Sequence, residues 1–152
     1  MSRREVPAFL LAAAILAMSG PWASFAHTGT IVDPLFARLG LPVEWATLAH
    51  AALRKVGHVL AYATLGALGF RAVGDRSRAL RSAGIAWAFA VLVAGADESL
   101  QSLTPARTGC VSDVALDAAG AALGVLVALG LFARRTVASA VTAEASGPGE
   151  AA

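Results

Sequence analysis

The chain has few charged residues and a single cysteine. Only 14% of its 152 residues are Asp, Glu, Lys or Arg, whereas soluble domains carry about 25%. This shortage excludes an ordinary soluble domain. No basic patch is interleaved with aromatic residues, which argues against nucleic-acid binding. The lone Cys110 excludes an intramolecular disulfide and a Cys-x-x-Cys metal or redox motif.

What the chain has instead is long apolar sequence, because hydrophobic residues make up 57% of it. A hydrocarbon core about 30 Å thick needs about 20 apolar residues in a helix to cross it. Four stretches approach this length, and we predict them as spans: residues 7–26, 56–72, 80–96 and 114–133. The predicted fold class is therefore an all-α integral membrane protein, a bundle of about four transmembrane helices.

Arginines indicate which side of the membrane each loop faces. Eight lie before the first span, at or between the facing ends of the second and third, or after the fourth: Arg3, Arg4, Arg71, Arg76, Arg78, Arg81, Arg134 and Arg135. The positive-inside rule makes these segments, and both termini, cytoplasmic. We predict a membrane domain over residues 1–135 and a disordered cytoplasmic tail over 136–152. In an alternative interpretation the first span is a secretory signal cleaved after Ala26.

Polar residues gather at the outer ends of the predicted spans and in the loop between the third and fourth. They are Lys55, His58, Tyr62, Asp97, Glu98, Gln101, Arg107, Asp113 and Asp117. Residues three, four or seven apart share a helix face, which groups Lys55, His58 and Tyr62 in one span. The same spacing groups Asp113 with Asp117 in another. Ionisable residues at membrane level are functional-site candidates, so we predict a polar site at the outer rim.

Three of these residues are candidates for catalysis: Glu98, Asp97 and His58. Glu98 is preferred over Asp97, since Asp97 has a simpler explanation as an ion-pair partner of Lys55. His58 suits proton transfer, because a histidine changes charge near neutral pH. Two acids and a histidine can also bind a divalent cation, but no ligand spacing here is diagnostic. We therefore assign no metal ligand and leave the cofactor open.

The remaining residues are candidates for binding a substrate. Lys55 and Arg107 would hold an anionic headgroup, and Tyr62, Gln101, Asp113 and Asp117 would line the site. Simpler roles compete with these. Lys55, like Arg54, would be an interfacial cation, and Asp113 would cap the fourth span. Gly120 and Gly124 have the small-x-x-x-small spacing of packed membrane helices.

These motifs together resemble the VanZ-like membrane proteins. The resemblance rests on Lys55-x-x-His58-x-x-x-Tyr62, Asp97-Glu98-x-x-Gln101, Pro105-x-Arg107 and Asp113-x-x-x-Asp117, in this order. The chain has Asp117 where that family usually has Asn, and Ala106 where it usually has Gly. The resemblance implies a role in the cell envelope, since the family is associated with low-level resistance to the glycopeptide teicoplanin.

The expected location is the bacterial cytoplasmic (inner) membrane, which the chain would cross several times. The expected partner is a membrane lipid or a lipid-linked envelope substrate, with no nucleic acid, and a homo-oligomer is an open alternative. Three mechanisms remain open. The site turns over a substrate, it binds a ligand or conducts ions without turnover, or its charges form a structural network that supports a partner protein.

Overall fold

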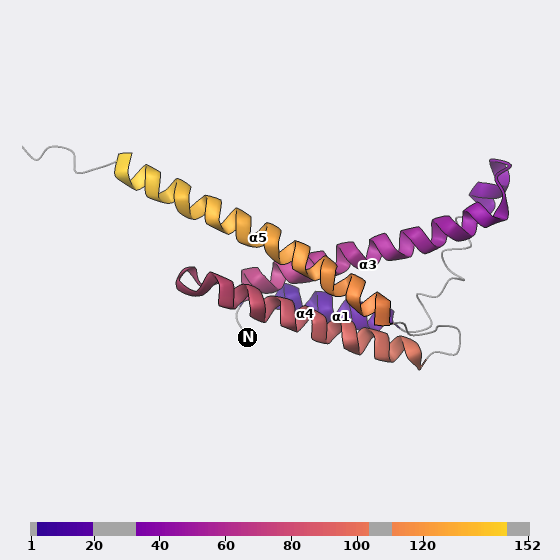
Figure 1. Cartoon of the computed structure of the whole chain (residues 1–152), viewed down its shortest axis with the longest axis horizontal. Coiled ribbons are helices and arrows are strands. Elements are labelled where there is room, and N and C mark those ends of the chain that lie inside the picture. Colours follow the sequence, from indigo (N-terminus) through magenta and orange to yellow (C-terminus); the bar gives the residue numbers. More distant parts are fainter. Residues whose placement is uncertain (1–2, 20–32, 104–110, 146–152) are drawn as a thin grey trace, which may run out of the picture.

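The computed structural model describes residues 3–19, 33–103 and 111–145. Its elements are α1 (Val6–Met18), a short helix at 33–38, α3 (Val43–Val73), the 3-10 turn η2 (Arg76–Arg78), α4 (Ala79–Ser102) and α5 (Val111–Ala145). None of the residues in these ranges lies in a strand. The prediction of an all-α bundle is confirmed, with the four main helices lying against one another (Figure 1).

Three of the helices, α3, α4 and α5, are long and apolar enough to cross a membrane. The helix α1 is apolar but has only 13 residues, or about 20 Å of length. The second part of the predicted first span, residues 20–26, lies outside the described residues. Large apolar side chains such as Leu60, Leu92 and Leu126 are exposed on the outer faces of the bundle. Such a surface fits contact with lipid chains.

Two helices are longer than the apolar stretches from which we predicted them. The helix α3 begins at Val43, directly after Pro42, and not near Val56. The helix α5 continues to Ala145, which corrects the predicted disorder from Thr136 onward for these residues. Hydropathy located only the apolar part of each helix. The added segments, 43–55 and 136–145, contain no glycine or proline to end a helix.

The helices α3 and α5 cross at a backbone contact that glycines make possible. A Cβ at Gly120 would lie 2.9 Å from the Val59 carbonyl oxygen, and one at Gly124 would overlap the Ala63 carbonyl. Gly66 meets the backbone of α5 in the same way. The predicted packing role of Gly120 and Gly124 is confirmed. Because residue numbers rise together along both helices, α3 and α5 run parallel.

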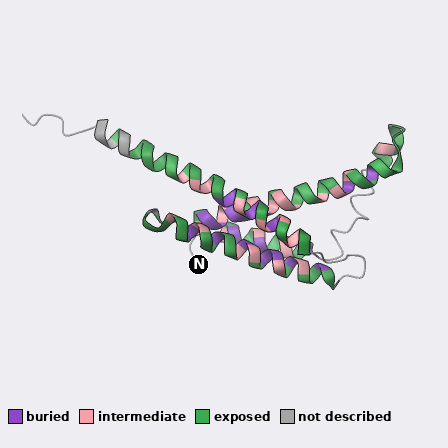
Figure 2. Ribbon diagram, in the orientation of Figure 1, coloured by how far each residue is buried: buried purple, intermediate pink, exposed green. Residues whose placement is uncertain are grey.

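The helices α1 and α4 run in the opposite direction and complete the bundle. The ring of Phe9 lies 5.5 Å from that of Phe89, while Ser19 contacts Asp97, so α1 and α4 are parallel to each other. Buried residues concentrate where the four helices cross (Figure 2). The first part of α3 and the last part of α5 extend past the bundle and are mostly exposed. Beyond the bundle, His50 contacts Asp33 of the short helix at 3.0 Å.

Candidate functional site

A cluster of polar side chains lies at the end of the bundle where α1 and α4 end and α5 begins. All four main helices contribute to it, α1 through the residue that follows its last turn. We call it the polar cluster, and its members are Ser19, His58, Tyr62, Asp97, Gln101 and Asp117. All of them except His58 are buried. Polar residues from three of the predicted spans thus lie together at one end of the bundle.

Asp97 is the centre of this hydrogen-bond network. Its side chain accepts from the Tyr62 hydroxyl at 3.1 Å and from the Gln101 amide at 3.0 Å. It also accepts from the Ser19 hydroxyl. These three donors come from α3, from the next turn of α4 and from the end of α1. Asp97 is only 3% exposed, and hydrogen bonds of this kind are what make a buried carboxylate tolerable.

Asp117 and His58 form a second pair beside Asp97. The Nδ1 atom of His58 lies 3.3 Å from Oδ2 of Asp117, and the His58 ring stacks near that of Tyr62 with 6.4 Å between centroids. Asp117 is 2% exposed. Its other oxygen, Oδ1, is buried and has no hydrogen-bond partner among the described residues.

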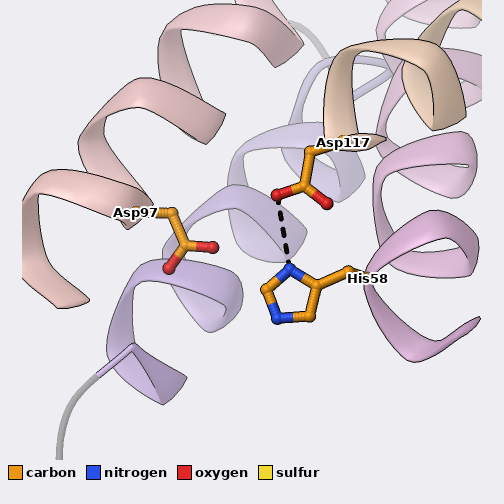
Figure 3. A group of neighbouring side chains, drawn as sticks. All are labelled: His58, Asp97 and Asp117. Carbon is orange, nitrogen blue, oxygen red and sulfur yellow. Dashed lines mark hydrogen bonds and ion pairs between the residues drawn. The ribbon is translucent and has the colours of Figure 1, made fainter. Parts of the chain in front are cut away.

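His58, Asp97 and Asp117 approach one another from three different helices. Each offers a nitrogen or oxygen atom that can bind a metal, and these atoms all lie within 4.8 Å of one another. Figure 3 shows the two carboxylates and the imidazole ring grouped around a common space. The arrangement can bind a cation, hold a proton or contact a polar group of a substrate.

One helical turn from this group, Arg54 of α3 pairs with Asp113 of α5 at 3.3 Å. Arg54 is four residues before His58, and Asp113 is four residues before Asp117. The two pairs therefore lie on consecutive turns of the same α3 and α5 interface. Asp113, which we predicted as a substrate-binding residue or a helix cap, therefore has an ion-pair partner. Arg54, for which we considered an interfacial role, faces α5.

We expect the Arg54 and Asp113 pair to add little stability, since the two side chains are 39% and 23% exposed. A double-mutant cycle of Arg54→Ala and Asp113→Ala should give a coupling free energy of about 0.2–1 kcal/mol. Equilibrium unfolding in mixed detergent micelles measures it. A coupling several times larger would show that lipid or other residues shield the pair from water.

The other predicted site residues lie less centrally. Lys55 is exposed and forms no ion pair within the part of the chain that the structure describes, so the suggested pairing with Asp97 is absent. Glu98 is half-buried and is not one of the three grouped ligands. Arg107 lies outside the described residues. Ser19 was missed, because a single serine at the end of an apolar stretch has no spacing pattern that distinguishes it.

Comparison of the sequence with known proteins finds a family match. The profile of the VanZ/LLP1 family matches residues 8–133. This range covers α3, α4, most of α1 and α5, and the whole polar cluster. No curated protein matches the chain, and no solved structure does. The family match and the three membrane-length helices together identify a membrane protein. The chain belongs to the VanZ/LLP1 family.

Proposed function

We propose that this protein crosses the cytoplasmic membrane of a bacterium and acts there on a membrane lipid or a lipid-linked envelope substrate, which the polar cluster binds. The observation that carries the proposal is the convergence of buried polar side chains from four helices on one end of the bundle. Placing polar groups inside a membrane protein costs free energy, and such groups serve a function in most cases.

The distribution of arginines supports an outward-facing cluster. Arg71, Arg78 and Arg81 lie around the turn between α3 and α4. This turn is at the opposite end of the bundle from the polar cluster, because α4 leads from it to Asp97. The positive-inside rule places such a turn in the cytoplasm. The polar cluster then faces the side on which envelope precursors are assembled and modified.

Lys55 is the residue best placed to attract an anionic headgroup. It is exposed and lies one turn before His58 on α3. Unlike Arg54, it forms no ion pair with any residue that the structure describes. A lysine acts as a point charge toward a phosphate or carboxylate, which suits a headgroup that arrives from the membrane surface. Arg107 is a second cation that would contact the same headgroup.

His58 is suited to proton exchange with a bound substrate. Asp117 contacts its Nδ1 atom, while its Nε2 atom makes no hydrogen bond with the described residues. A carboxylate at one ring nitrogen orients the imidazole and leaves the other nitrogen to accept or donate a proton. Asp97 is the fixed negative charge beside this exchange, and Glu98 is the second acid near the headgroup.

Teicoplanin susceptibility tests the envelope role directly. A glycopeptide-sensitive bacterial host that expresses the wild-type protein should need more teicoplanin for growth inhibition than the same host with an empty vector. The reason is that a protein acting on envelope precursors alters the targets that the antibiotic reaches. Vancomycin, measured in parallel, shows whether the effect extends to other glycopeptides. If well-expressed protein gives no protection from teicoplanin, a resistance role is wrong, and direct lipid binding becomes the next assay.

A further inference from the structure

We propose that His58, Asp97 and Asp117 form a binding site for one divalent transition-metal ion of the Mn²⁺ or Zn²⁺ class. The use of this ion rests on the proposed function, since the ion would contact the substrate in the polar cluster. The binding of the ion does not rest on it and can be measured without any activity. Three independent features of the described residues support the site.

The first feature is geometry. One atom from each of the three residues lies within 4.8 Å of the other two. Ligand atoms arranged tetrahedrally around one ion at about 2.0–2.2 Å lie about 3.3–3.6 Å apart. The His58 and Asp117 atoms already have this separation. Asp97 therefore needs to approach them by about 1 Å, which a change in side-chain torsion supplies. The three side chains already face one another from α3, α4 and α5 (Figure 3).

The second feature is charge. Asp97 and Asp117 are both nearly completely buried, and no lysine or arginine pairs with either of them within residues 3–19, 33–103 and 111–145. Buried carboxylates are costly unless a positive charge compensates them. A protonated His58 would compensate only one. A divalent ion compensates both, with His58 as a neutral ligand.

The third feature is an unsatisfied atom. Oδ1 of Asp117 is buried and lacks a hydrogen-bond partner in the described part of the chain. Such atoms are rare in folded proteins and call for an explanation. A carboxylate oxygen accepts and cannot donate, so the partner it needs is a hydrogen-bond donor or a cation. A cation that Asp117 bound through Oδ1 would satisfy this requirement.

The surroundings of Asp97 resemble those of a metal ligand. Carboxylates that bind metals are usually held in place by further hydrogen bonds. Asp97 has three such bonds, from Ser19, Tyr62 and Gln101. Ser19 and Gln101 both donate to Oδ1, and Tyr62 donates to Oδ2. These donors fix the direction of the carboxylate and leave a lone pair on Oδ2 for an ion.

The ligand set indicates which ions fit. One imidazole nitrogen with two carboxylates favours Mn²⁺ or Zn²⁺ over Ca²⁺ and Mg²⁺, which prefer oxygen ligands alone. Three protein ligands leave at least one position for water or for a substrate oxygen. When the ion is bound, His58 serves as a ligand, and a water on the ion supplies the exchangeable proton. The phosphate of a headgroup attracted by Lys55 would fit this open position.

Titration of the purified full-length protein with MnCl₂ in detergent tests the site. Electron paramagnetic resonance of free Mn²⁺ should show one bound ion per chain, and ZnCl₂ should displace it. Asp117→Asn, which keeps the shape of the side chain, should weaken Mn²⁺ binding by more than about tenfold. Asp75→Asn is the matched control, because Asp75 is exposed beside η2, and this variant should bind Mn²⁺ like the wild type.

Two results would overturn the metal site: no Mn²⁺ or Zn²⁺ binding by the folded wild type, or equal binding by Asp117→Asn. Circular dichroism of each variant verifies that the helices are intact. His58→Gln provides a second ligand deletion if Asp117→Asn folds poorly. Mn²⁺ binding without teicoplanin protection would support the metal site and contradict the resistance role. Teicoplanin protection without Mn²⁺ or Zn²⁺ binding would support the resistance role and contradict the metal site.

Discussion

Gly124→Ala is expected to destabilise the protein strongly, although it adds a single methyl group. That methyl would overlap the backbone carbonyl of Ala63, and backbone atoms cannot turn aside as a flexible side chain can. The crossing of α3 and α5 would have to widen. Overpacking of this kind costs about 1–3 kcal/mol. Thermal or denaturant unfolding in detergent, followed by circular dichroism, measures the loss.

Gly130→Ala is the matched control, since it makes the same change in the same helix. A Cβ at Gly130 has no atom within 4 Å. Alanine stabilises a helix interior by about 0.5–1 kcal/mol relative to glycine, so this variant should be as stable as the wild type or more so. Similar stability of the two variants would show that α3 and α5 do not pack by backbone contact at Gly124.

Asp97→Asn is the second substitution with a large expected effect, and it should abolish teicoplanin protection. It removes the negative charge next to His58 and Asp117. It also places an amide N–H₂ group where the carboxylate accepts from Tyr62 or Gln101. Repacking that network costs about 1–3 kcal/mol, so membrane abundance must be measured beside susceptibility. A full loss of protection at near-normal abundance would assign the charge of Asp97 to function.

Glu98→Gln is the comparison that separates two neighbouring acids. From the sequence alone we preferred Glu98 as the working carboxylate, whereas the structure places Asp97 in the cluster with His58 and Asp117. We therefore expect Glu98→Gln to retain more protection than Asp97→Asn. The opposite order would return the main role to Glu98. Equal and complete retention of protection in both variants would contradict a charge-dependent site.

The sequence contains a pattern that distinguishes Asp97 from Glu98. Small residues recur along α4 at Ala86, Ala90 and Ala94, and these are buried. Asp97 follows Ala94 by three residues, and Gln101 follows Asp97 by four. At about 100° per residue, both lie within about 20° of the mean direction of the three alanines, whereas Glu98 lies about 80° away. The stripe predicts which acid faces inward. The predicted pairing of Asp97 with Lys55 instead favoured Glu98 as the working acid.

Other parts of the site depend on how the helices are rotated against one another. Arg54 and Lys55 are adjacent, and both lie about one turn before His58. Only the position of α5 decides that Arg54 meets Asp113 while Lys55 faces outward. Spacing within one helix cannot supply that information. The all-α fold and the three helices of membrane-spanning length follow from apolar length alone, and these could be predicted.

The length of α3 sets the depth at which the polar cluster lies in the bilayer. From Val73, the last residue of α3, back to His58 is fifteen residues, or about 22 Å of helix. Any tilt of the helix reduces this height, while the hydrocarbon core is about 30 Å thick. If Val73 marks the cytoplasmic boundary, His58 lies below the outer hydrocarbon surface. A headgroup then reaches it only where the membrane thins or the lipid sinks, which links access to the acyl-chain length of the surrounding lipids.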